Sequence, residues 1–205
     1  GYPFAANPLS GVWYPPGWLA IFFPQPLGLN LVLFAHLWWG GWGMFRFLES
    51  RGLRLEACWL GALFFALMPK LTAHLAAGHV TLIYALSWTP WLLWAERRRQ
   101  QQSGYWGQYL LPAVILAAIL LADVRWAAYA VLLWGGYGMA LQRGGLDRRL
   151  GWLAGSAGLL ILGILLAAPL LLPFVEYVGL STRQYLTPME SFTLSLPPEK
   201  LLGLL

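Results

Sequence analysis

The chain has few charged residues and a single cysteine. Only 10% of its 205 residues are Asp, Glu, Lys or Arg, whereas soluble globular domains carry about 25%. A soluble domain of this size could not cover its surface with so few charges, so we exclude that class. The basic residues are spread through a hydrophobic chain, which argues against a nucleic-acid-binding patch. With Cys58 alone, neither an intrachain disulfide nor a cysteine-based zinc site can form.

Hydrophobic residues make up 59% of the chain. This share is enough for about six membrane spans of ~20 residues each. The predicted fold class is therefore an all-α polytopic membrane protein. The chain begins at Gly1 with neither an initiator Met nor a recognisable signal peptide, and it stops inside an apolar run. We expect it to be a fragment of a longer chain.

The distribution of proline divides the chain into three parts. Residues 1–26 are uncharged and rich in proline, which breaks regular helix, so we predict an interfacial loop with one short helix over 18–23. A six-helix transmembrane domain over 27–172 follows, in which Pro69 ends the second span and Pro173 follows the sixth. Residues 173–205 are expected to form an extracytoplasmic loop that leads into a truncated next segment. The predicted spans are 27–48, 56–68, 80–95, 106–122, 126–141 and 150–172.

Arginines gather in alternate connections between these spans. Nine of the thirteen basic residues lie at the first, third and fifth connections. Cytoplasmic connections carry such an excess of Arg and Lys. The pattern therefore predicts a membrane protein with these connections in the cytoplasm and both ends of the chain outside. The nine are Arg46, Arg51, Arg54, Arg97, Arg98, Arg99, Arg143, Arg148 and Arg149.

The predicted outward turn at 69–79 holds Lys70, His74 and His79. The two histidines are five residues apart, which is not the i, i+4 spacing that places two metal ligands on one helical face. No acid accompanies them, so no cofactor is evident and a divalent metal has no support from the sequence. Lys and His side chains can donate hydrogen bonds to an anionic headgroup. Helix capping and snorkelling toward the membrane surface is the alternative role.

The next outward turn contains Asp123 and Arg125. They form either a local salt bridge that caps helix ends or an acid and a phosphate-binding arginine at the mouth of a cavity. Arg183, in the predicted tail, is the strongest phosphate candidate, because a guanidinium fork matches phosphate oxygens; a solvated loop residue is the alternative. His36, inside the first span, is predicted to be buried and hydrogen-bonded. The many tryptophans are predicted to anchor spans at the membrane interface, with stacking on a pigment or quinone as the alternative.

Several stretches resemble a known family. They are GYPFAANPLSGVWYPP at 1–16, PKLTAHLAAGH at 69–79 with YALSWTPW at 84–91, DVRW at 123–126, and APLLLPFVEY at 168–177 with STR at 181–183 and LPP at 196–198. In their order and content they are similar to the YfhO-like bacterial membrane proteins, which belong to the GT-C type of polyprenyl-phosphate-sugar glycosyltransferases. The resemblance covers essentially the whole chain.

The resemblance implies a GT-C-like module of the bacterial plasma membrane that lacks its first span and works on the extracytoplasmic side. The intact enzyme would move a sugar from a polyprenyl phosphate carrier to a glycan, lipid or protein acceptor. Lys70, His74, His79, Arg125 and Arg183 are then expected to bind the carrier phosphate. Asp123 is expected to be a secondary catalytic acid or the partner that orients Arg125. The family's main acid would precede Gly1, so this fragment should be inactive alone.

Two other classes remain open from the sequence. A transporter or lipid flippase would use the same cavity without bond chemistry, and it should line a path through the bilayer with ionisable groups. Near the span interiors only Arg46, Glu56 and His36 are found, which disfavours ion coupling. A non-catalytic membrane scaffold or pigment-binding subunit is the third class, suggested by the tryptophan content.

Overall fold

The computed structural model describes residues 3–101 and 106–181, and this part of the chain is helical without strands. Two short 3-10 helices, η1 (Phe4–Ala6) and η2 (Pro15–Phe22), precede the first long helix. The α-helices of the described residues are α1 (Leu27–Ser50), α2 (Leu55–Ala66), α3 (Pro69–Ala76), α4 (Val80–Gln101), α5 (Trp106–Ala122), α6 (Val124–Ala140), α7 (Leu146–Leu166) and α8 (Ala168–Gly179). The all-helical class expected from the sequence is confirmed.

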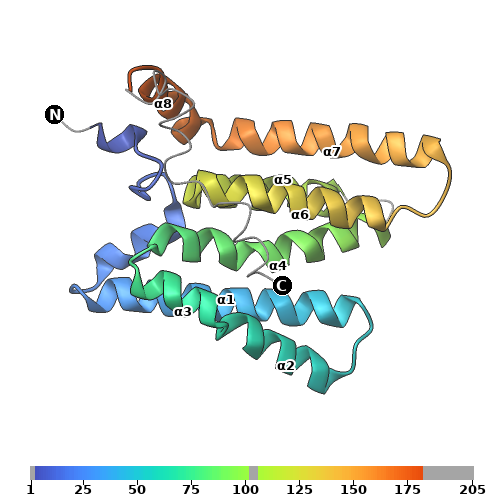
Figure 1. Ribbon diagram of the computed structural model, residues 1–205, viewed down its shortest axis with the longest axis horizontal. Coiled ribbons are helices and arrows are strands. Elements are labelled where there is room, and N and C mark those ends of the chain that lie inside the picture. The colour runs from blue at the N-terminus through green and yellow to red at the C-terminus, as the bar shows by residue number, and fades with distance from the viewer. Residues whose placement is uncertain (1–2, 102–105, 182–205) are drawn as a thin grey trace, which may run out of the picture.

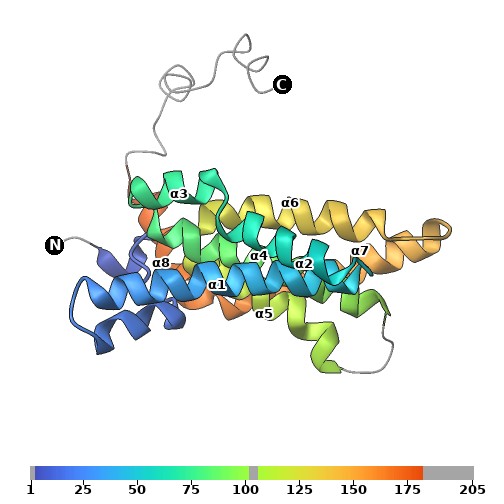
Figure 2. The same ribbon diagram turned by 90° about the horizontal axis from the view of Figure 1, so that it is seen from below.

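The long helices run back and forth along one axis (Figures 1 and 2). In chain order, α1, α2 continued by α3, α4, α5, α6 and α7 alternate in direction, so every second connection lies at the same end of the bundle. One end, which we call the arginine end, holds the α1–α2 and α6–α7 connections and the last turns of α4. The opposite end, which we call the η2 end, holds η1, η2, α3, α8 and the α5–α6 turn. The arginine-rich segments of the sequence are therefore gathered at one end.

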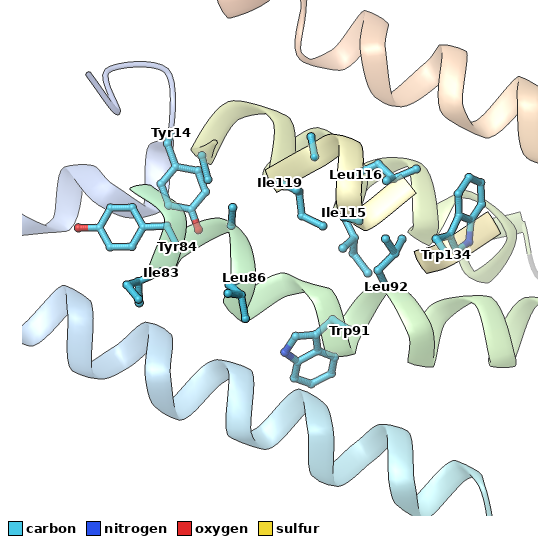
Figure 3. Packing of buried hydrophobic residues seen from close by; sticks show 14 of the residues in the cluster. Tyr14, Ile83, Tyr84, Leu86, Trp91, Leu92, Ile115, Leu116, Ile119 and Trp134 are labelled. Atoms are coloured by element: carbon cyan, nitrogen blue, oxygen red, sulfur yellow. The ribbon is translucent and has the colours of Figure 1, made fainter. Parts of the chain in front are cut away.

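Helix α4 lies at the centre of the bundle and packs against α1, α3, α5 and α6. Its buried side chains and those of α5 form most of one hydrophobic core. Figure 3 shows Ile115 of α5 beside Leu92 of α4, Ile119 further along α5 toward Tyr14, and Trp91 on the side of α4 that faces α1. The Trp91 indole N–H donates to the backbone oxygen of Trp39 at 2.9 Å, which ties α4 to α1.

A buried carboxylate joins three helices near the arginine end. Glu96 of α4 has no exposed surface. It accepts hydrogen bonds from the Arg99 guanidinium at 2.9 and 3.0 Å, from the Gln100 amide, and from the indoles of Trp134 in α6 and Trp152 in α7 at 2.8 Å each. A buried ion pair is tolerated only when such donors replace the lost water. The carboxylate therefore sets how α6 and α7 sit on α4.

The expectations about proline were partly wrong. Pro69 does follow the end of α2, but it also begins a further helix, α3, where a turn was expected. Proline at a first helical position lacks only an N–H that would have no partner there. Pro173 does not end a helix but lies inside α8, and the sixth segment ends at Leu166 rather than at 172. Pro90 and Pro112 also lie inside helices, α4 and α5. Tertiary packing therefore overrides the helix-breaking tendency at these sites.

The outward faces of the bundle are apolar. Phe34 of α1, Phe64 of α2 and Leu132 of α6 are each about 70% exposed, at 69%, 74% and 73%. Among the described residues, two helices are long and apolar enough to cross a membrane: Leu55–Ala76, which is α2 continued by α3, and α7. Only 17% of the apolar stretch of each is buried. They are therefore unlike the mostly buried core helix of a soluble protein.

Replacing Gly138 by Ala should destabilise the bundle. A Cβ atom at Gly138 would lie 2.2 Å from the Trp152 ring, which Glu96 holds in place. We expect a loss of about 1–3 kcal/mol, the usual cost of overpacking. Gly135→Ala on the same helix is the matched control, because a Cβ there meets nothing within 4 Å. Thermal unfolding in detergent, followed by circular dichroism, should show a lower midpoint for Gly138→Ala alone; equal midpoints would contradict the Trp152 packing.

Candidate functional site

Asp123 caps the first turn of α6 at the η2 end. Its carboxylate has no exposed surface and accepts from the backbone N–H groups of Arg125 and Trp126 at 3.0 and 3.2 Å. The Arg125 guanidinium also donates to it through Nε at 3.1 Å and Nη2 at 2.7 Å. From the first turn of α4, Thr81 donates through its hydroxyl at 3.0 Å. Asp123 thus joins the α5–α6 turn to the start of α4.

The environment of Asp123 keeps it ionised. Burial by itself would raise the pKa of this carboxyl. The hydrogen bonds from Arg125 and Thr81, the charge of Arg125 and the N–H of Trp126 outweigh burial and hold the pKa below its usual 3.8. With its oxygens already occupied by these donors, Asp123 is placed to hold Arg125 rather than to take a proton from a substrate. The Arg125 side chain remains 54% exposed, so it can contact a ligand at this end.

A chain of hydrogen bonds lies beneath η2. The Trp88 indole donates to the Tyr14 hydroxyl oxygen at 2.6 Å, and that hydroxyl lies 2.8 Å from His36 Nε2. His36 Nδ1 lies 2.7 Å from the carbonyl oxygen of Val32, so this nitrogen carries the proton and donates. Nε2 is then the acceptor, and the Tyr14 hydroxyl donates to it. Burial raises the pKa of Tyr14 well above its usual value, so the phenol keeps this proton.

An apolar pocket of about 460 Å³ adjoins this chain. It lies between η2, α1 and α4, and its volume is within the range of small-molecule sites, about 300–1,000 Å³. His36 and Trp88 contribute to its wall, so the hydrogen-bonded chain fixes the shape of that wall. The other lining residues are Pro16, Leu19, Phe23, Leu31, Val32, Ala35, Trp38 and Trp39. Several are exposed on the outer face of the bundle, Trp38 to 60%, so the pocket lies beside the apolar outer surface.

The residues Lys70, His74 and His79 lie on and just after α3, at the η2 end. His74 Nδ1 and His79 Nδ1 are 3.0 Å apart, so one of these nitrogens carries a proton and donates a hydrogen bond to the other. Lys70 and His79 are exposed. The described residues contain no group of three or more His, Cys, Asp and Glu side chains that could hold a metal ion.

The structure brings the predicted residues together in two pairs, Asp123 with Arg125 and His74 with His79. The hydrogen bond from Thr81 to Asp123 connects the α3–α4 turn, which holds His79, with the α5–α6 turn, because Thr81 is only two residues beyond His79. Arg183 lies outside the described residues. For Asp123, the geometry favours the second of its two expected roles, the partner that orients Arg125.

Sequence reasoning missed the parts that depend on contacts across the bundle. His36 was expected to be buried and hydrogen-bonded, and this is confirmed. Its partner Tyr14 lies 22 residues away in the proline-rich segment, and no local pattern indicates the pairing. Glu96 was overlooked beside the arginines at 97–99. The lone acid in that basic run was the available signal.

Comparison of the chain with protein-family models, curated proteins and solved structures found no match. The resemblance to the YfhO-like proteins therefore rests on the sequence motifs. The structure itself defines an all-helical bundle with an apolar pocket and hydrogen-bond donors at one end.

Asp123→Asn should lower the free energy of unfolding at neutral pH and make that free energy less sensitive to a fall in pH. Asn can still cap α6 but cannot pair with Arg125, so we expect a loss of about 1–3 kcal/mol. Because the folded pKa lies below the usual 3.8, the contribution of the charge is fully present above that value and disappears as the pH falls through the folded pKa. The difference in unfolding midpoint between wild type and Asp123→Asn should therefore shrink below pH 3.8.

Asp147→Asn is the control, since Asp147 is exposed in the first turn of α7. It should leave the midpoint at neutral pH nearly unchanged. A gap between wild type and Asp123→Asn that stays constant down to pH 2.5, about one unit below the usual carboxyl range, would contradict the pairing.

Proposed function

We propose that the chain is a multi-pass membrane domain whose arginine end faces the cytoplasm. The observation that supports this proposal most is the apolar outer surface of the bundle, which is formed by α1, α2, α6 and α7. Apolar patches of this extent on a soluble protein would be interaction sites or liabilities for aggregation. The gathering of the arginine-rich segments at one end adds an orientation, because such segments remain in the cytoplasm.

By length alone, the helices could supply six passes, although only two of those in the described residues are also apolar enough by composition. Besides Leu55–Ala76 and α7, α1 has 24 residues and α4 has 22. At 1.5 Å per residue these two helices measure about 36 and 33 Å, against a hydrocarbon core of ~30 Å. α5 and α6, with 17 residues each, are at the lower limit for a span.

Cysteine labelling tests this orientation. In a background with Cys58 replaced by Ser, Ala77→Cys puts a thiol in the exposed α3–α4 turn and Gly145→Cys puts one in the exposed α6–α7 connection. A membrane-impermeant maleimide should label Ala77→Cys in intact cells, and Gly145→Cys only after permeabilisation. Labelling of Gly145→Cys in intact cells would contradict the orientation, and complete recovery in the soluble fraction would contradict membrane insertion.

The function that fits this domain best is binding of a polyprenyl-phosphate-linked sugar for a GT-C-type glycosyl transfer. The supporting observation is that the apolar pocket and the exposed donors Lys70, His79 and Arg125 lie at the same end of the bundle. An isoprenoid chain is apolar and a carrier phosphate is anionic, so the two parts of the ligand match the two kinds of surface.

In such a transfer, the bond between the sugar and the carrier phosphate breaks as an acceptor hydroxyl attacks the sugar and loses its proton to a base. The leaving phosphate gains charge that cations and hydrogen-bond donors stabilise. Arg125, held by Asp123, is suited to that stabilising role. Asp123 is not suited to act as that base, since its oxygens are occupied by donors from Thr81 and Arg125.

A transporter is favoured less. Each buried carboxylate forms a salt bridge with an arginine close to it in the sequence, Glu96 with Arg99 and Asp123 with Arg125. An ion-coupled carrier needs groups that change partners as the ion passes, and these carboxylates are already bonded on all sides by protein donors.

Filling the pocket should block binding of the carrier. Ala35 is exposed and lines the pocket, so Ala35→Trp can fold while occupying space that the isoprenoid chain needs. If the Trp ring displaces two methylene groups of the isoprenoid chain from the pocket, binding weakens by about 1.6 kcal/mol. Photo-crosslinking of a diazirine-bearing prenyl phosphate to the full-length protein should then fall about tenfold. Ala128→Trp is the control, because Ala128 is exposed on α6 and does not line the pocket.

Equal crosslinking to Ala35→Trp and Ala128→Trp would contradict the pocket as the carrier site. Sugar transfer by the full-length enzyme should follow the crosslinking. Uptake of labelled substrate into proteoliposomes without covalent change would instead favour a transporter.

A further inference from the structure

Two arginines from different helices approach one tryptophan near the arginine end. The guanidinium carbon of Arg98 lies 5.1 Å from the centroid of the Trp94 ring, and that of Arg46 lies 5.9 Å from it. Arg98 and Trp94 are one turn apart on α4, whereas Arg46 belongs to the last turns of α1. The ring is half-buried against the hydrophobic core. The Trp94 indole thus lies within about 6 Å of guanidinium groups from two different helices.

Arg98 differs from its neighbours in lacking an acceptor. Its Nε is buried and has no hydrogen-bond partner among the described residues. Arg99, the next residue, is bonded to Glu96, and Arg46 lies 3.5 Å from Glu49. Glu96 cannot serve Arg98 as well, because the donors from α4, α6 and α7 already surround it. A buried donor on a charged group is costly without an acceptor, so an anion bound here would remove that cost.

Helix α6, which packs against α4, also has a buried polar atom without a hydrogen-bond partner in the part of the chain that the structure describes. The Tyr137 hydroxyl is buried without a partner in the described structure. The Tyr137 ring packs edge-on against Phe47, with centroids 5.5 Å apart, and Phe47 follows Arg46 in the chain. Unpartnered polar atoms on α4 and α6 therefore occur at the same end of the bundle.

We propose that Arg98 and Arg46, supported by Trp94, bind the phosphate of an anionic phospholipid at the cytoplasmic surface. This inference rests on the membrane orientation proposed above, which puts the arginine end in the headgroup region. Basic pockets between spans on that side suit anionic headgroups, and a guanidinium matches phosphate oxygens with its fork of donors. The apolar outer faces of the helices would lie beside the acyl chains of the same lipid.

The test compares lipid affinity in nanodiscs of the full-length protein. Phosphatidylglycerol is titrated into phosphatidylcholine nanodiscs at 0.15 M salt, and the bound lipid is counted by native mass spectrometry. We expect Arg98→Gln to bind phosphatidylglycerol at least about tenfold more weakly than wild type. Arg143→Gln removes the same charge at the same end, from an exposed side chain that does not stack on Trp94. It should change the affinity by less than about threefold.

Equal losses in Arg98→Gln and Arg143→Gln would overturn the proposal, since the effect would then be general attraction to a negative surface. A rise in the thermal unfolding midpoint with inorganic phosphate that equals the rise with phosphatidylglycerol would also overturn it, because the ligand would not be a lipid. If Arg98→Gln does not fold, Arg46→Gln tests the same site, and unchanged affinity there would contradict it. Failure to enter nanodiscs would count against the membrane proposal instead, so the two failures are distinguishable.

Discussion

The Glu96 carboxylate is the constraint on which the packing of the bundle depends. Moving an ion out of water costs several kcal/mol, so a carboxylate without exposed surface requires donors at fixed positions. They come from α4 itself, from α6 and from α7, and Arg99 reaches on to the Ser156 hydroxyl at 2.9 Å. The indole of Trp152 then occupies the space above Gly138. Apolar packing alone tolerates sliding between helices, whereas this set of donors fixes their register.

The same principle operates at the other end of α4. Thr81 in its first turn donates to Asp123, a second carboxylate without exposed surface that is also paired with an arginine. Thr81 and Glu96 are 15 residues apart, or about 22 Å along the helix, so the central helix is anchored near both ends. Between these anchors, the indoles of Trp88, Trp91 and Trp126 donate to groups inside the bundle. Many tryptophans therefore stabilise the interior, although the sequence suggested interfacial anchoring.

Because α4 is anchored near both of its ends, the two ends of the bundle can carry different sites. At the η2 end, Asp123 orients an exposed arginine, and the Tyr14–His36 pair supports the wall of an apolar pocket. At the arginine end, Glu96 is fully engaged with Arg99 and its neighbours, which leaves Arg98 without a carboxylate. The proposed carrier site and the proposed lipid site both follow from how the buried carboxylates distribute the arginines.

Local composition was enough to predict the helical class and the positions of most helices. Apolar stretches predict helices from local composition, and α5 matches its predicted range, 106–122, with Asp123 directly after it as the N-cap of α6. Asp123 and Arg125 are two residues apart, and a local salt bridge between them was one of the two roles that the sequence left open. Contacts across the bundle set the places of Pro69 and Pro173 in helices and the partners of Glu96, His36 and Tyr14. A proline or a buried polar group is tolerated according to its neighbours in space, and these lie far away in the chain.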